Sequence, residues 1–281
     1  MHEGVGGVPL LLVHGWPETK RIWWKAITPL VEAGFEVIVP DLRGFGDSDI
    51  GPDGFHDVPS HARDLACLVT EELGHDEVVV AGGDLGGPVI QDMSMRFPGL
   101  VRRMVLFNSP LPYMKEEMAG LRTRPPVEST DYFVRQATDP DGLAAELDTV
   151  DKRCRYIATF YTSRFWGHPG QFSAADVDFH TEPFGDGVKL RASFGAYEST
   201  VNPGARSEAP AMGAPNPTET LVLFGPSDHV LYPDFDLMSE IVFPNRVGPY
   251  LLRDCGHFVP WEATDRFVAA VRVFCRDLLA R

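Results

Sequence analysis

A single carboxylate, Asp84, stands among four glycines in the segment GGDLGG, residues 82–87. The apolar run 78–81 before it predicts a strand, and residues 88–97 after it predict a helix. A sharp turn from strand to helix, with small residues around its centre, is the geometry of a nucleophile elbow. A glycine-rich Asx turn or helix cap would also explain this segment, so the rest of the chain must decide.

Two more residues could work with this carboxylate. Asp228 follows the apolar run 220–224, and His257 follows the run 250–252. In open parallel sheets ligands bind beyond the carboxyl ends of the strands, so we expect these side chains to meet Asp84 there. The chain order nucleophile, acid, base is the order found in α/β-hydrolases. We therefore predict a triad in which Asp84 attacks and His257, oriented by Asp228, acts as the base.

Each member of this triad has a simpler explanation when it is taken alone. His257 could be a hydrogen-bonded structural histidine, and Asp228 could be a turn residue. Asn108, directly after the run 101–107, occupies a place that holds the acid in some proteins of this fold, but an amide cannot hold an imidazolium by charge. Asp234 and Asp236 lie farther from a strand end and are expected at the solvated surface. Asp228 remains the predicted acid.

The elements that must position these residues alternate between short apolar runs and helix-length segments. This alternation is typical of a mostly parallel sheet flanked by helices. From about residue 110 it stops, and an aromatic, helix-prone stretch follows, which predicts a mainly helical cap insertion. A closing helix is expected over 264–279. The expected strands are 9–13, 35–39, 78–81, 101–107, 220–224 and 250–252, and the expected units are core 1–109, cap 110–217 and core 218–281.

Composition limits the classes of partner. The chain has 281 residues, a formal net charge of -15 and 44% hydrophobic residues. Its negative field argues against nucleic acid and anionic membrane surfaces, and no segment reaches membrane-spanning length. The N-terminus has no basic region of a signal peptide. The four cysteines form no CxxC pair, so we expect neither zinc nor disulfides, and a cytoplasmic location.

The sequence resembles the epoxide hydrolases of the α/β-hydrolase fold over nearly its whole length. The shared motifs are HGWPE at 14–18, DLRGFGDSD at 41–49, the aspartate elbow and GHF at 256–258. The resemblance implies that a small apolar epoxide is converted to a vicinal diol through an aspartyl ester, with no metal or organic cofactor. It also implies that the backbone N–H groups of Trp16 and Leu85 form the oxyanion hole.

In this family two cap tyrosines donate to the leaving oxygen. Tyr132 and Tyr197 lie in the segments that resemble theirs, whereas Tyr156 and Tyr161 are the rivals. The aromatic residues of the cap suggest an apolar pocket. The residues expected to contact the substrate are Trp16, Phe133, Phe160, Tyr161, Phe165 and Trp166.

The chain departs from the family pattern at Gly83 and Leu85, where members often carry His and Trp. Haloalkane dehalogenases bind halide with a Trp after the nucleophile, and fluoroacetate dehalogenases place an Arg there, so Leu85 favours neither. Few residues precede the first expected strand, where relatives carry a β-hairpin, so we expect a reduced or truncated sheet edge. A haloalkane or haloacid dehalogenase and a non-catalytic small-molecule receptor remain alternatives, and a homodimer is left open.

Overall fold

The computed structural model describes residues 1–125 and 130–280. Within them one sheet of seven strands has the order β1-β3-β2-β4-β5-β6-β7. The short β1 pairs antiparallel with β3, and the other neighbours are parallel. The α/β-hydrolase fold class is confirmed. The strands are β1 His2–Glu3, β2 Val8–Val13, β3 Phe35–Ile38, β4 Val78–Gly83, β5 Val101–Phe107, β6 Thr220–Phe224 and β7 Arg246–Leu251.

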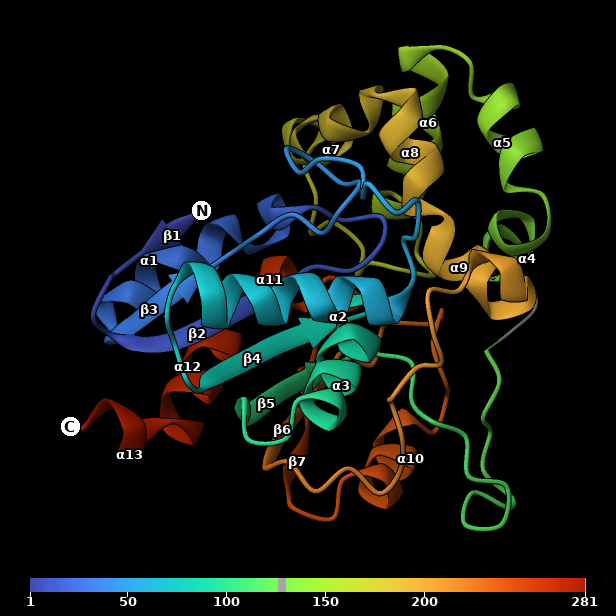
Figure 1. The fold of residues 1–281 in the computed structure, drawn as a ribbon. Helices are drawn as coiled ribbons and strands as arrows, with labels where there is room; N and C mark the ends of the chain where they lie inside the picture. Colours follow the sequence, from blue (N-terminus) through green and yellow to red (C-terminus); the bar gives the residue numbers. More distant parts are fainter. Residues whose placement is uncertain (126–129, 281) are drawn as a thin grey trace.

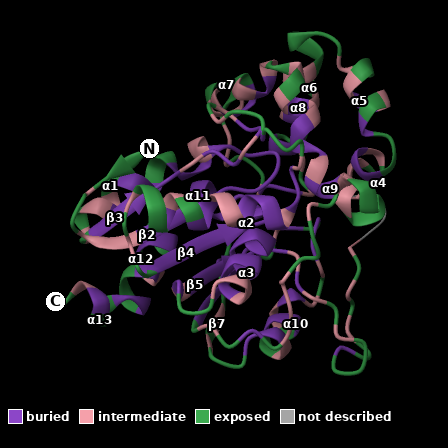
Figure 2. Ribbon diagram, viewed as in Figure 1, coloured by how far each residue is buried: buried purple, intermediate pink, exposed green. Residues whose placement is uncertain are grey.

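Helices cover the sheet because its central strands are apolar on both faces. All six residues of β4 are buried, as the continuous apolar run predicts. Helices α2 (Val58–Cys67) and α3 (Gly86–Arg96) lie in front of the sheet in Figure 1. Phe267 of α12 contacts Phe107 of β5. Figure 2 shows the central strands β4 and β5 as largely buried.

The remaining core helices are short or broken. The closing helix expected over 264–279 is two helices, because the regular helix stops at Cys275, which has φ -101° and ψ 11°. The helices not yet given are η1 Lys20–Trp23, α1 Trp24–Glu32, η2 Leu68–Glu72, α10 Phe235–Val242, α11 Val259–Glu262, α12 Thr264–Phe274 and α13 Arg276–Leu279.

A group of helices interrupts the core between β5 and β6 and lies beyond the tip of the β4 arrow in Figure 1. We propose 110–217 as the extent of this cap, of which residues 126–129 lie outside the described part of the chain. Its helices are α4 Asp131–Thr138, α5 Pro140–Glu146, α6 Val150–Tyr161, α7 Ala174–Thr181, η4 Glu182–Gly185, α8 Gly187–Ser193, α9 Gly195–Val201 and η5 Pro203–Ala205.

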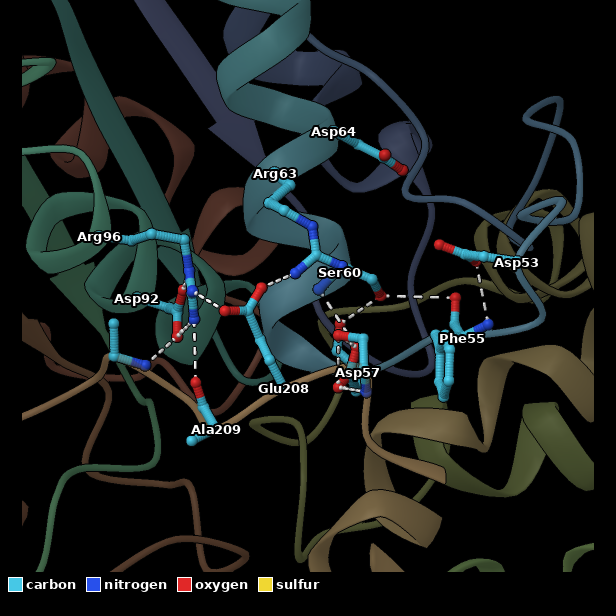
Figure 3. Close-up of polar contacts among 12 residues, drawn as sticks. Asp53, Phe55, Asp57, Ser60, Arg63, Asp64, Asp92, Arg96, Glu208 and Ala209 are labelled. Atoms are coloured by element: carbon cyan, nitrogen blue, oxygen red, sulfur yellow. Dashed lines mark hydrogen bonds and ion pairs between the residues drawn. The ribbon is translucent and has the colours of Figure 1, made fainter. Parts of the chain in front are cut away.

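The segment that returns from the cap to β6 is tied to two core helices (Figure 3). Asp57, the N-cap of α2, accepts hydrogen bonds from the backbone N–H of Ser207 at 2.7 Å and from its hydroxyl at 2.8 Å. Glu208 lies between Arg63 of α2 and Arg96 of α3 and pairs with both. These contacts hold the returning segment against α2 and α3.

Candidate active site

The turn after β4 requires its glycines because neighbouring backbone comes too close for a side chain. Asp84 has a positive φ of 43°. A Cβ added at Gly86 would lie 2.4 Å from the carbonyl oxygen of Val13, and one at Gly15 would lie 2.5 Å from the Cβ of Asp84. The strained φ and these close approaches are those of a nucleophile elbow, and they push the carboxylate out of the strand end.

The glycine before the nucleophile is explained by one aromatic ring. A Cβ at Gly83 would lie 2.3 Å from Cε2 of Phe107, the last residue of β5. The Phe107 ring also packs against Trp23 and Phe267. The space that a larger residue would need at position 83 is therefore filled from the neighbouring strand.

The nucleophile is held by one of the two predicted oxyanion donors. The backbone N–H of Trp16 donates to Oδ1 of Asp84 at 2.6 Å. Leu85 is the N-cap residue of α3, and its N–H has no acceptor in the described part of the chain. Asp84 itself is 6% exposed. One donor therefore holds the carboxylate now, and the second is free for charge that develops later.

The imidazole of His257 lies between the two carboxylates. Its Nδ1 is 2.8 Å from Oδ2 of Asp228, and its Nε2 is 3.3 Å from Oδ2 of Asp84. A carboxylate can only accept, so Nδ1 carries the proton of that bond. Burial opposes the charged imidazolium, but Asp228 and Asp84 outweigh it and raise the pKa of His257 well above its usual value.

Asn108 orients the acid rather than replacing it. Its Nδ2 donates to Oδ2 of Asp228 at 2.8 Å, and its Oδ1 accepts from the N–H of Gly225 at 2.8 Å. The backbone N–H groups of Val230 and Leu231 bind Oδ1 of the same aspartate. The sequence alone suggests Asn108 only as a rival for the acid. Its position directly after a strand was the signal that it reaches the site.

Glu18 is a second buried acid near the triad, to which sequence analysis gave no role. Its Oε2 accepts from the N–H of Gly15 at 2.6 Å, within the loop that carries Trp16. Burial raises the pKa of Glu18 to about 7; His257 lowers it and Asp84 raises it. Glu18 therefore braces the loop that presents the Trp16 N–H.

The two predicted tyrosines lie together over the nucleophile. Tyr132 comes from α4 and Tyr197 from α9, with ring centroids 6.0 Å apart. Tyr132 stacks on the Trp16 ring, and Tyr197 meets that ring edge-on. Burial raises the pKa of both phenols, and the charge of Asp84 raises it further. Both phenols are therefore protonated at neutral pH and can donate.

The rival tyrosines are engaged elsewhere. The hydroxyl of Tyr156 accepts from Nε2 of Gln136 at 3.1 Å. The hydroxyl of Tyr161 donates to the carbonyl oxygen of Pro17 at 2.6 Å. Neither residue lines the cavity at Asp84. The geometry thus brings Tyr132 and Tyr197 to the nucleophile and not the two rivals.

A cavity of about 790 Å³ opens between the core and the cap. Asp84, Leu85, Tyr132 and Tyr197 contribute to its wall. Much of the remaining lining is apolar, which suits a small organic ligand. Its apolar lining residues include Pro88, Leu111, Phe133, Val230 and Leu231.

Of the residues expected to contact the substrate, Phe133 alone is part of this wall as described. The structure places the other side chains behind it. Phe160 and Trp166 pack against Trp16, and Tyr161 stacks between His180 and Phe258. Phe165 is half-buried and is also absent from the described lining. These aromatic residues form a packed layer that supports the site. The composition of the cap does not show which way each ring faces, so it could not separate this layer from the cavity wall.

The described residues contain no group of three His, Cys, Asp or Glu side chains that could hold a metal ion. The site itself offers a carboxylate nucleophile, an imidazole base, two phenol donors and two backbone N–H groups.

Comparisons with known proteins agree with this geometry. The family model described as alpha/beta hydrolase fold matches residues 8–264. The soluble epoxide hydrolase of Corynebacterium sp. (strain C12) is 30% identical over 260 residues, which cover 91% of this chain and 86% of that protein. The AB hydrolase superfamily protein YfhM of Bacillus subtilis (strain 168) is 28% identical over 212 residues, 73% of this chain and 69% of that protein.

Solved structures show the same likeness. The epoxide hydrolase CorEH without ligand superimposes with a TM-score of 0.81 and 26% sequence identity, and the match covers 97% of this chain and 92% of that one. The juvenile hormone epoxide hydrolase from the silkworm Bombyx mori has a TM-score of 0.75 at 22% identity, and the match covers 98% of this chain and 73% of that one.

Proposed function

The chain belongs to the α/β-hydrolase fold family and functions as an epoxide hydrolase, and we propose that it acts through a covalent ester on Asp84. The observation that carries this mechanism is the cavity wall itself. Asp84, Tyr132 and Tyr197 all contribute to it, and the raised pKa values of the two phenols support their role as proton donors. A nucleophile and proton donors on one cavity are what ring opening of an oxirane requires.

In the first step Oδ2 of Asp84 attacks a ring carbon, and the bond from that carbon to the ring oxygen breaks. The ring oxygen takes a proton from the phenol of Tyr132 or Tyr197, which prevents a free alkoxide from forming. The Trp16 N–H holds Oδ1, which becomes the carbonyl oxygen of the ester. The enzyme then carries a hydroxyalkyl ester on Asp84.

In the second step a water molecule attacks the ester carbonyl carbon while Nε2 of His257 takes its proton. The negative charge that develops on Oδ1 is held by the N–H groups of Trp16 and Leu85. The ester bond then breaks, and the leaving alcohol oxygen takes the proton held by His257. The second proton of the water passes from the new carboxyl group of Asp84 to the phenolate left by the first step, and the vicinal diol is released. Because the ester removes the charge of Asp84, it also removes one of the two carboxylates that raise the pKa of His257.

A panel of epoxides assayed for diol tests this function directly. We expect diol formation from at least one small apolar epoxide, and loss of that activity in Asp84→Asn. A dehalogenase would instead release halide from haloalkanes or haloacids, and a receptor would release neither product. Leu85 has no side-chain donor for a halide, which favours the epoxide hydrolase.

We further propose a cytoplasmic enzyme, with a homodimer as the assembly to test. All four cysteines, Cys67, Cys154, Cys255 and Cys275, are free, as in reducing compartments. No helix in the described residues is both long and apolar enough to cross a membrane. Light scattering of the purified protein would distinguish a monomer from a dimer.

A further inference from the structure

The backbone on both sides of the catalytic histidine is bound by one buried carboxylate. The N–H of Gly256 donates to Oε2 of Glu262 at 2.8 Å, and the N–H of Phe258 donates to Oε1 at 2.9 Å. The N–H of His257 itself donates to the carbonyl oxygen of Trp166 at 2.7 Å. Three consecutive N–H groups of the histidine loop are thus satisfied, two of them by Glu262.

The same carboxylate reaches the cap. The backbone N–H of His168 donates to Oε2 of Glu262 at 2.7 Å. We call residues 165–168 the cap loop. A Cβ at Gly256 would lie 2.3 Å from the carbonyl oxygen of Trp166, so the cap loop is pressed against the histidine loop. The cap loop also touches the acid's loop, because the N–H of His229 donates to the carbonyl oxygen of Phe165 at 2.8 Å.

This arrangement has a mechanical consequence for the base. Hydrogen bonds to a charged group are stronger than neutral ones, and Glu262 is 8% exposed, so water competes little for them. Fixing the N–H groups before and after His257 fixes the backbone torsions at that residue. The imidazole is thereby held between Asp228 and Asp84, and general-base catalysis depends on that geometry.

We propose that Glu262 is a positioning residue for ester hydrolysis, which clamps the histidine loop to the cap loop and so holds His257 in place to activate water. The proposal rests on the two-step function proposed above. Glu262 binds the backbone on both sides of His257, so we expect its effect on the substrate to pass through that histidine.

The test separates the two half-reactions by rapid quench, with the ester on Asp84 quantified by mass spectrometry. In Glu262→Gln one carboxylate oxygen becomes an amide nitrogen, which cannot accept an N–H. We expect alkylation within about twofold of wild type and ester hydrolysis slowed by about tenfold or more, since a well-placed general base contributes roughly 10² to 10⁴ in rate. The ester should accumulate during turnover.

Glu36→Gln is the matched control. Glu36 is also buried, lies on β3 and accepts from the N–H of Gly6 at 2.9 Å, but it has no contact with the triad in the described structure. It should lose stability without selective loss of ester hydrolysis. If Glu262→Gln leaves hydrolysis at the wild-type rate, or slows both steps equally, the positioning role is overturned.

Two further variants distinguish a folding defect from loss of the positioning role. If Glu262→Gln does not fold, Glu262→Asp keeps the charge but withdraws the oxygens by one methylene, and the same selective loss is expected of it. His257→Gln serves as the reference for the function itself. A reference variant that binds substrate but forms no ester would refute the covalent mechanism, whereas an ester there with normal hydrolysis in both Glu262 variants would refute the role of Glu262 alone.

Discussion

Nε2 of His257 lies 3.3 Å from Oδ2 of Asp84 yet makes no hydrogen bond within the described residues. The two atoms are close enough for a hydrogen bond, but their geometry is not aligned for one. The unpaired Nε2 is the atom that must accept a proton from water in ester hydrolysis. We therefore expect Asp84 to act in the first step and His257, its neighbour, to act in the second.

Removing the base should leave the first step intact. We expect His257→Gln, incubated with an epoxide substrate, to gain the mass of one whole epoxide on the peptide that carries Asp84. The ester should persist because Gln cannot take a proton from water. Peptide mass spectrometry provides the measurement. An unmodified peptide, despite demonstrated substrate binding, would contradict covalent catalysis.

The path of the water oxygen gives an independent check. Because water attacks the ester carbonyl carbon, a single turnover in heavy-oxygen water should label the carboxylate of Asp84 and leave the first diol largely unlabelled. Mass spectrometry of both products resolves the two fates. Label in the first diol would indicate direct attack by water on the epoxide, with Asp84 serving only as a base.

The two phenols should share the protonation of one oxygen. A donor of this kind is worth roughly 10² to 10³ in rate, and either phenol can partly cover for the other. We therefore expect Tyr132→Phe and Tyr197→Phe each to slow alkylation while leaving measurable activity, and the double variant to be nearly inactive.

Tyr156→Phe is the control for these variants, because its hydroxyl is bound by Gln136 and it does not line the cavity. It should alkylate at close to the wild-type rate. Circular dichroism and thermal melting should show that all variants fold. A folded double variant that opens epoxides normally would refute the assignment of Tyr132 and Tyr197.

The pH dependence of hydrolysis should reflect the raised pKa of His257. Burial opposes the imidazolium, whereas Asp228 and Asp84 favour it, and the net pKa is well above the usual value. Only neutral imidazole can act as the base, so ester hydrolysis should rise with pH. Alkylation removes the charge of Asp84, so the midpoint of hydrolysis should lie at lower pH than the titration of His257 in the resting enzyme.

Rapid quench across a range of pH gives the midpoint of ester hydrolysis. Nuclear magnetic resonance of the imidazole gives the midpoint of the His257 titration in the resting enzyme. Asp228→Asn should move both midpoints to lower pH, because it removes the charge that most favours the proton on His257. Equal midpoints in the resting and alkylated enzyme would mean that Asp84 contributes nothing to the pKa of His257.

The elbow should tolerate no methyl group at Gly86. A Cβ there would lie 2.4 Å from a backbone oxygen, which cannot move as a flexible side chain can. We expect Gly86→Ala to lower the free energy of unfolding by about 1–3 kcal/mol or more, as overpacking does. Urea denaturation measures this change. Gly213→Ala is the control, since its Cβ would be 3.6 Å from the nearest described atom; equal losses in both variants would contradict the steric explanation.

The sheet and the meeting of the three triad side chains could be predicted from the sequence. Apolar runs mark buried strands locally, and parallel strands end at one edge, so residues that follow the runs must meet there. That rule predicts that Asp84, Asp228 and His257 lie close together, although it gives no distances. The glycines of the elbow could also be recognised in the sequence, because a sharp turn requires small residues within the turn itself.

The distant groups that support the triad could not be predicted from the sequence. Asn108 binds Asp228, which is 120 residues away, and Glu262 binds the N–H of His168, which is 94 residues away, and no local pattern encodes such partners. The choice of Tyr132 over Tyr156 depended on how α4 and α6 are turned in the cap, as did the position of the aromatic layer behind the cavity wall. Composition shows that rings will be buried, but the direction in which each one points is settled by packing against residues that the sequence places far away.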